Sequence, residues 1–360
     1  DTEYLRIGKS KEGIVGKRIV GLALAVSDDD VPVLGEAYPG NRHDTTVFPG
    51  LFEGVCDRLI AAGADLEAVT VVFDRGFDDQ ANFDLAATNK PSLVAAVKRN
   101  RTVIREALNA AELDAFKQAY DTTYGTCYVT DAGRVDIGER TWRLVLSYHD
   151  TTREKRQADL DARRADAEEV LSAQLERLEQ GGRGRPPTEN SIRRKLKTVL
   201  GDELTYLEWA FDEETTDLEW EWGEGWERRY RYAGIQPIIT DHDDWTAGRV
   251  AKTYFDRNDI EDLFHLTKQA LVVPVQPPYV KEDHLIRAHL FIVFVGLVCY
   301  QHVKRQVPAS MTDEAIKAAL ERLDMVVALE DEPVQCRLSN LDATTTTVVE
   351  AMDLEDYLPD

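Results

Sequence analysis

Cysteine is scarce in this 360-residue chain, whose four cysteines lie far apart and form no C-x-x-C pair. This spacing gives no support for a zinc finger or a disulfide framework, and it favours a reduced, cytoplasmic setting. Long hydrophobic runs are scarce too. The longest, LFIVFVGLVCY at 290–300, is too short to span a membrane, so we interpret it as part of a buried core helix over about 283–304. No secretory signal is visible at the start, and we expect no membrane partner.

Positive charge is also in short supply. The chain has 43 Lys and Arg against 66 Asp and Glu, which gives a net charge of −23. Such a surface repels nucleic acid unless its basic groups are segregated. Concentrated salt screens this repulsion, since the Debye length falls to about 3 Å at 1 M, and acidic surfaces keep proteins soluble there. The composition therefore predicts a halophilic source; the charge alone would otherwise favour an ordinary acidic cytosolic protein.

The pattern that is present is that of a globular α/β protein. Hydrophobic residues make up 43% of the chain, enough for a sizeable core. Strands and helices are expected to alternate in the first hundred residues, which predicts some parallel strand pairing. The expected elements are a β-hairpin over 18–41, a helix over 44–62, a strand over 69–73 that ends at Asp74, a helix over 79–89 and a strand over 92–98.

The sequence changes character between about residues 100 and 240. Short antiparallel strands are expected over 124–150, and a long, highly charged helix over 151–180. A stretch rich in Trp and Tyr then returns to strand-like sequence over 208–241. We interpret this region as an insertion between two halves of a catalytic core.

Four polar side chains recur at helical spacing near residue 260: Tyr254, Arg257, Glu261 and Lys268. At about 100° per residue they fall on one stripe of a helix, which we expect to run from about 245 to 270. A carboxylate can hold a divalent metal ion, and two cations can hold phosphate. Charged residues at this spacing otherwise form a solvated, ion-paired helix face.

These segments together resemble the catalytic domain of DDE transposases of bacterial and archaeal insertion sequences. They are most similar to the branch with a Y-x2-R-x3-E-x6-K signature, and all four signature positions match. YPGNRHDTTVF resembles the family's G-N-x-x-D segment, VFDRGFDDQANF its second-acid motif, and RYAGIQPIITD the strand before its third-acid helix. LIRAHLFIVFVGL resembles the helix that closes the core, so the similarity covers most of residues 1–305.

The resemblance implies an α/β, ribonuclease-H-like catalytic core interrupted by a mixed β-rich and helical insertion. It predicts four segments along the chain. These are a first part of the core over 1–100, the insertion over 101–240, a second part of the core with the third-acid helix over 241–305, and a peripheral C-terminal tail over 306–360.

The same resemblance implies three carboxylates that bind two Mg²⁺ (or Mn²⁺) ions and cut and join DNA strands. Asp74 and Glu261 match the second and third acids. Asp1 is the nearest match to the first acid, because Asp1-Thr2 precedes the G-x-S-K segment at Gly8–Lys11. The spacing is shorter there than in the family.

Three signature residues are expected to contact DNA. By the resemblance, Arg257, Lys268 and Tyr254 hold phosphates of the cleaved end, with packing at the helix start as an equal alternative for Tyr254. The expected partners are the element's terminal inverted repeats and target DNA, with a homodimer in the DNA complex. Two other functions use the same residues: a ribonuclease-H-like nuclease that cuts without joining, and an inactive or truncated transposase-derived protein that only binds DNA.

Overall fold

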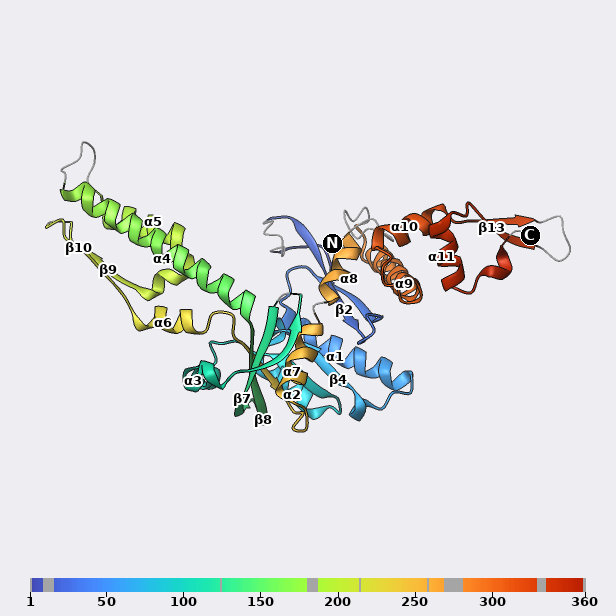
Figure 1. The fold of residues 1–360 in the computed structure, drawn as a ribbon, viewed down its shortest axis with the longest axis horizontal. Coiled ribbons are helices and arrows are strands. Elements are labelled where there is room, and N and C mark those ends of the chain that lie inside the picture. The colour runs from blue at the N-terminus through green and yellow to red at the C-terminus, as the bar shows by residue number, and fades with distance from the viewer. Residues whose placement is uncertain are drawn as a thin grey trace. The chain divides into compact units, whose positions relative to one another are not determined.

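The computed structural model describes residues 2–8, 16–123, 125–179, 187–213, 215–257, 259–268, 281–328 and 335–358. The chain divides into two compact units. Unit 1 comprises Asp1–Val69 and Asp256–Asp360, and unit 2 comprises Thr70–Phe255. Unit 2 is thus the continuous middle of the chain, and unit 1 is assembled from its two ends (Figure 1).

Unit 2 is built on a mixed sheet with the strand order β4-β5-β11-β8-β7-β6. The pair β4 and β5 is parallel, and every other neighbouring pair is antiparallel. Since β5 and β8 both run antiparallel to β11, the strands β4, β5 and β8 all end at one edge of the sheet, which we call the carboxyl edge. The strands are β4 (Thr70–Phe73), β5 (Ser92–Ala96), β6 (Lys117–Thr122), β7 (Gly125–Ile137), β8 (Arg140–His149) and β11 (Gln236–Thr240).

The central strands are apolar on both faces because helices cover both faces. Residues 93–96 of β5, 144–146 of β8 and 238–239 of β11 are all at most 1% exposed. Successive strand residues point to opposite faces, so Val94 and Val145 meet α7 (Ala247–Asp256). On the other face, Phe83 of α2 (Gln80–Thr88) contacts the rings of Phe73 and Trp142. Each such buried side chain stabilises the sheet by about 1.5–3 kcal/mol.

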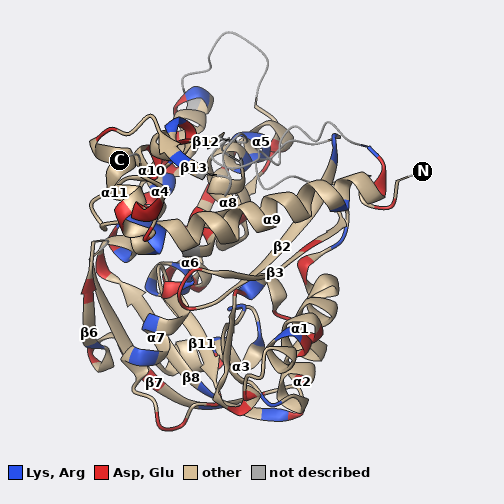
Figure 2. Cartoon of the chain, turned by 90° about the vertical axis from the view of Figure 1, so that its right-hand side faces the viewer, with Lys and Arg blue, Asp and Glu red and all other residues tan. Residues whose placement is uncertain are grey.

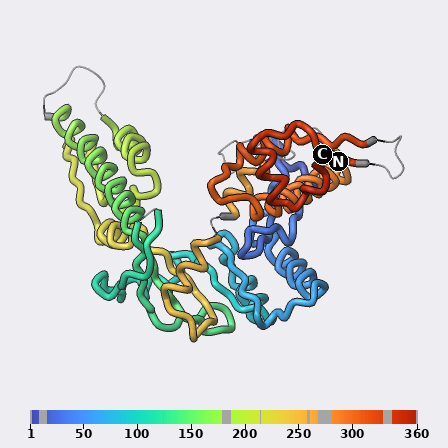
Figure 3. The backbone as a smooth tube through the Cα atoms, turned by 45° about the vertical axis from the view of Figure 1, so that its right-hand side comes forward, coloured from blue at the N-terminus to red at the C-terminus, as the bar shows by residue number. Residues whose placement is uncertain are grey.

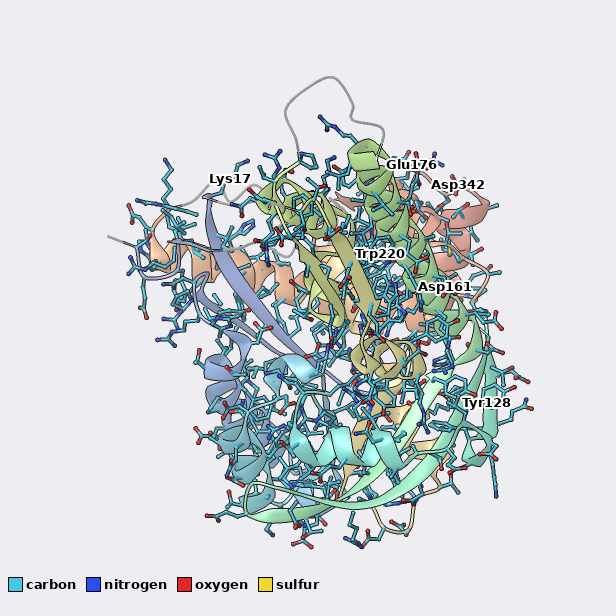
Figure 4. The ribbon with its side chains drawn as sticks, turned by 90° about the vertical axis from the view of Figure 1, so that its left-hand side faces the viewer. Lys17, Tyr128, Asp161, Glu176, Trp220 and Asp342 are labelled. Carbon is cyan, nitrogen blue, oxygen red and sulfur yellow. The ribbon has the colours of Figure 1, made fainter. Side chains whose placement is uncertain are left out.

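A second apolar cluster of unit 2 lies in an arm that follows β8. There α4 and α5 run side by side, and β9 pairs with β10 (Figure 3). Leu171, Ile192, Leu196 and Trp226 are fully buried in this cluster, and Trp220 of β10 packs against it (Figure 4). The elements are α4 (Asp150–Glu179), α5 (Glu189–Leu200), β9 (Leu207–Phe211), β10 (Leu218–Trp222) and α6 (Glu224–Arg231).

The base of the arm is continuous with the sheet. β8 ends at His149 and α4 begins at Asp150, with no residue between them. Arg153, in the first turn of α4, donates hydrogen bonds of 2.9 and 2.7 Å to the carbonyls of Arg231 and Ala233, just before β11. Beyond its base, α4 carries acidic and basic residues along most of its length (Figure 2). β6, β7 and β8, which come from the predicted insertion, share their sheet with β4 and β5 from the predicted core.

Unit 1 contains the predicted β-hairpin and the long apolar helix α9. The hairpin over 18–41 is confirmed: β2 and β3 pair antiparallel. The ring of Phe294 in α9 lies against Gly35 of β3, where an added Cβ would lie only 2.6 Å from it. The elements are β1 (Arg6–Ile7), β2 (Arg18–Val26), β3 (Pro32–Pro39), α1 (Asp44–Ala61), α8 (Asp259–Lys268), α9 (Asp283–Gln306), α10 (Asp313–Arg322), β12 (Asp324–Ala328), β13 (Gln335–Ser339) and α11 (Ala343–Ala351).

The core of unit 1 joins helices from distant parts of the sequence. Leu263 of α8, Leu297 of α9, Ile316 of α10 and Val348 of α11 all belong to one buried cluster. The C-terminal tail therefore contributes apolar side chains to this core.

The remaining elements come from both units. They are α3 (Thr102–Ala110) and the short 3₁₀ helices η1 (Leu66–Ala68), η2 (Arg75–Phe77), η3 (Leu113–Ala115), η4 (Gly201–Tyr206) and η5 (Glu355–Tyr357).

The helix α9 contains the apolar run at 290–300. It is the one helix in the described residues that is long and apolar enough to cross a membrane, by length and composition only. Within its most apolar 18-residue window, 33% is buried inside the protein. A core helix of a soluble protein passes the same test, so this single helix is weak evidence for a membrane span. Its buried side chains are Ile286, Leu290, Val293, Leu297, Tyr300 and Gln301.

The prediction of one helix from about 245 to 270 is wrong, because two helices occupy this segment. Thr246 caps α7, since its Oγ1 accepts a 3.1 Å hydrogen bond from the N–H of Arg249, but α7 ends at Asp256 and α8 begins at Asp259. The junction sequence Asp-Arg-Asn-Asp is rich in Asp and Asn, whose side chains compete for backbone hydrogen bonds and weaken helices. The four residues therefore do not share one helix: Tyr254 lies on α7, Glu261 and Lys268 lie on α8, and Arg257 lies between the two helices.

Candidate functional site

Asp74 lies where the sequence predicts it, directly after the buried end of β4. Phe73 is 5% exposed, whereas Asp74 is half-buried. One carboxylate oxygen of Asp74 accepts a 2.7 Å hydrogen bond from the backbone N–H of Gly76 and caps the short helix η2. The cap fixes the direction of the carboxylate at the carboxyl edge of the sheet. The main-chain bond uses one oxygen, which leaves Asp74 capacity to bind another group.

Positive charge gathers at this same edge. Because β4, β5 and β8 all end there, the residues after each strand are brought together, as are those just before β11. Eight basic residues of these stretches concern the site, and acidic residues such as Asp74, Asp78 and Asp150 lie among them, in a chain whose net charge is −23. The eight basic residues are Arg75, Lys98, Arg99, Arg101, Arg153, Arg156, Arg229 and Arg231.

Several of these basic groups stabilise the fold. Arg101 forms an ion pair with the fully buried carboxylate of Asp78, and its Nε donates to that carboxylate at 2.8 Å. Arg153 is 8% exposed and bonds two carbonyls before β11, as described above. Arg231 donates a 2.5 Å hydrogen bond to the carbonyl of Ala111. These groups already have acceptors and hold the carboxyl edge together.

Glu261 is exposed on α8, in unit 1. The same helix buries Leu263 and Leu266 in the core of that unit, which leaves Glu261 and the neighbouring Asp262 facing solvent. This arrangement fixes the backbone beneath a carboxylate that keeps its full capacity for metal or hydrogen bonding. Lys268 is the last residue of α8, and its side chain lies outside the described residues.

The other two signature residues lie at or before the break between the helices. Tyr254 is 2% exposed in α7 and packs with Val250 and Ala251 in a core cluster of unit 2. Its ring also meets that of Phe255, with centroids 5.2 Å apart. Packing, the alternative considered for Tyr254, is thus the arrangement in this structure. Arg257 is half-buried, and its carbonyl accepts a 3.1 Å bond from the N–H of Ile260 at the start of α8.

The three acids expected to bind metal do not fall within one described body. Asp1 lies outside the described residues, Asp74 belongs to unit 2, and Glu261 belongs to unit 1. Across the described ranges, no three side chains of His, Cys, Asp or Glu come together as a metal site. Asp74 and Glu261 both offer carboxylate oxygens, which are the ligands that Mg²⁺ and Mn²⁺ prefer. The donor chemistry of these two residues fits such an ion.

Comparison with known proteins adds no further assignment. No protein-family model matches this chain, and no curated protein matches it. The resemblance to DDE transposases therefore remains an interpretation of the residues quoted above.

Sequence reasoning missed part of the carboxyl edge. The rule that found Asp74, a polar residue directly after a buried strand, also applies to Lys98 and Arg99, which follow β5. Arg156 and Arg229 could not be found that way. They reach the edge only because β8 and β11 are neighbours in the sheet, and no local pattern specifies that pairing.

Proposed function

We propose that this protein is a transposase of the DDE type, which cuts and joins DNA strands with a divalent metal ion on a ribonuclease-H-like core. The observation that carries the proposal is the position of Asp74. Its capped, half-exposed carboxylate lies at the carboxyl edge of the β4–β5 pair, among basic residues. In open parallel sheets, ligands bind outside the carboxyl ends of the strands, and β4 and β5 are the parallel pair of this sheet.

The charge distribution supports DNA as the substrate. A chain with a net charge of −23 needs segregated basic groups to approach a phosphate backbone. Of the eight basic residues at the carboxyl edge, Arg75, Arg99 and Arg156 are not already bonded to an acceptor among the described residues. The site would act on terminal inverted repeats and target DNA in the cytoplasm, and the active form in the DNA complex would be a homodimer.

In this proposal the carboxylates have defined tasks. Asp74 and Glu261, with Asp1 as the third acid, would hold Mg²⁺ or Mn²⁺. Bound metal supplies a Lewis acid for the phosphate and a more acidic water or 3′-hydroxyl as nucleophile. Arg257 and Lys268 would hold phosphates of the cleaved end and keep it in line for attack. Tyr254 would contribute by packing α7 into the core of unit 2.

The direct test is cleavage of DNA fragments that carry the sequence on either side of this gene, with Mg²⁺ or Mn²⁺ present. Glu261→Gln should abolish cleavage, because the amide is neutral and a poor metal ligand. Asp262→Asn is the matched control, since it removes the same charge from the next exposed residue of α8, and it should cleave like the parent. Equal cleavage by Glu261→Gln and the parent protein would overturn the assignment.

The products separate the alternative functions. Strand joining to a second DNA molecule supports the transposase. Acid-dependent cutting without joining identifies a nuclease instead. Binding to the end fragments without any metal-dependent cutting identifies a non-catalytic, transposase-derived protein.

A further inference from the structure

Four arginines from four separate elements approach one another at the carboxyl edge of unit 2. Arg99 follows β5, and its charge interacts with those of three other guanidinium groups. These belong to η2 after β4, to the second turn of α4 and to α6 before β11: Arg75, Arg156 and Arg229. The fold thus holds four positive charges close together, although they repel one another.

Counter-charge is scarce in this cluster. Within the described part of the chain, Arg75, Arg99 and Arg156 have no hydrogen-bond acceptor and no acidic partner. The Nε atom of Arg99 is fully buried and has no partner among these residues. Only Arg229 is paired, at 3.1 Å from Glu203, and that carboxylate is shared with Arg163 at 3.0 Å.

The electrostatic cost of this arrangement is visible at Arg99. Burial, followed by repulsion from the neighbouring guanidinium groups, lowers the pKa of Arg99 to about 10. Partial burial likewise lowers the pKa of Arg156, with the charges of Arg75 and Arg229 adding to the effect. Arg99 nevertheless stays charged at neutral pH. A buried, repelled and unpaired donor destabilises the protein on its own, and a bound anion removes that penalty.

We propose that Arg75, Arg99 and Arg156 form a phosphate-binding site that holds the backbone of a DNA strand beside Asp74. Guanidinium groups present planar pairs of N–H donors that match the oxygens of a phosphodiester. Arg75 and Arg156 are exposed and Arg99 is half-buried, so all three side chains keep some surface open to solvent. The choice of DNA rests on the proposed function, and inorganic phosphate is the other source of the same chemistry.

The test measures binding without catalysis. A fluorescently labelled DNA duplex is titrated with protein in EDTA, at several salt concentrations, and its anisotropy is recorded. Arg156→Gln and Arg99→Gln should each weaken binding about tenfold or more. Each should also reduce the slope of log affinity against log salt by about one, because one phosphate contact is lost.

Arg134→Gln is the matched control. Arg134 is exposed on β7 near the start of β8, away from the carboxyl edge, and pairs with Asp243 at 2.7 Å. This variant loses the same charge from the same sheet and should bind DNA like the parent. If Arg156→Gln and Arg99→Gln bind no more weakly than Arg134→Gln, the inference is overturned.

Stability distinguishes a binding role from a structural one. Arg99→Gln should melt at the same temperature as the parent or higher, since a repelled buried charge is removed. A clear loss of melting temperature would assign Arg99 to the fold and overturn its role in binding; Arg156, which is exposed, then decides the site alone.

Inorganic phosphate forms the second arm. If phosphate raises the melting temperature of the parent but not of Arg99→Gln, while neither variant changes DNA affinity, the site binds free phosphate and the DNA assignment fails. The DNA-binding test is also independent of the proposed cleavage chemistry, because it is run without metal. If Glu261→Gln still cleaves DNA, the transposase assignment fails, but the affinities measured for the arginine variants are unaffected.

Discussion

The carboxylate of Asp74 accepts a 2.7 Å hydrogen bond from the backbone N–H of Gly76. The side chain therefore has two separable properties, an oxygen acceptor that caps η2 and a negative charge at the carboxyl edge. Amide and carboxylate oxygens both accept such a bond, but only the carboxylate binds a divalent cation strongly.

Asp74→Asn should keep the hydrogen bond that caps η2 but lose metal-dependent DNA cleavage. We expect its melting temperature to stay close to that of the parent, with metal-dependent DNA cleavage reduced to background. Asp74→Ala should lose cleavage as well, and about 1 kcal/mol of stability from the missing cap. Thermal unfolding and the cleavage assay measure the two properties. An Asp74→Asn protein that cleaves normally would show that this carboxylate is dispensable.

The ion pair between Arg101 and Asp78 predicts a large effect on stability. The Asp78 side chain is fully buried, so Arg101→Met leaves a carboxylate without its cation in a poorly solvated site. The expected loss is about 3–5 kcal/mol of unfolding free energy, measured by urea denaturation. Arg105→Met, at an exposed position of α3, should change stability by about 0.5 kcal/mol at most. Similar values for the two variants would contradict the importance of this pair.

Tyr254 offers a test between packing and phosphate contact. Its ring is 2% exposed, so Tyr254→Ala should cost about 3–5 kcal/mol of unfolding free energy. Tyr254→Phe keeps the ring and should lose about 1 kcal/mol, with DNA cleavage close to that of the parent. A Tyr254→Phe protein that folds normally but cleaves more than tenfold slower would instead place the hydroxyl at the phosphate.

The ring of His242 predicts a pH dependence of unit 2. Burial lowers the pKa of His242, which bonds Thr70 Oγ1 at 2.8 Å and stacks on Trp245 with centroids 3.7 Å apart. The folded state therefore favours the neutral ring. The stability that the neutral ring contributes is fully present above pH 6.5, the pKa of His242 in the unfolded chain. It is lost as the pH falls through 6.5 towards the lower pKa of His242 in the folded protein.

His242→Gln removes that titration. We expect the difference in unfolding free energy between the parent and this variant to shrink between pH 7.5 and 5, and urea unfolding at each pH measures it. Carboxylates far from His242 affect both proteins equally and cancel in the difference. Asp241 and Asp244 interact with the ring, so their coupling to it is part of the difference measured. A difference that stays constant with pH would show that His242 titrates alike in both states.

Local patterns predicted much of the secondary structure. The hairpin at 18–41 follows from two β-rich runs around Ser27–Asp30, and the strand that ends at Asp74 follows from a continuous apolar run. The break between α7 and α8 was missed. Apolar residues continue at helical spacing across it, and that periodicity outweighed the weak helix propensity of Asp256 and Asp259.

Long-range pairing could not be predicted in the same way. The hydroxyl of Thr240 donates to the carbonyl of Leu93 at 2.7 Å, although 147 residues separate them in the sequence. No local sequence pattern in either segment identifies the other as its pairing partner. For the same reason Asp74 was found from its own strand, whereas the proximity of Arg99, Arg156 and Arg229 depends on the complete order of the sheet.

The direct passage from β8 into α4 has a mechanical consequence. A 30-residue α-helix is roughly 45 Å long, and here it leaves a strand without a loop and is tied at its first turn by Arg153. It therefore acts as a lever whose fulcrum lies at the carboxyl edge. A rotation of roughly 10° about that base would move the far end of α4 by roughly 8 Å.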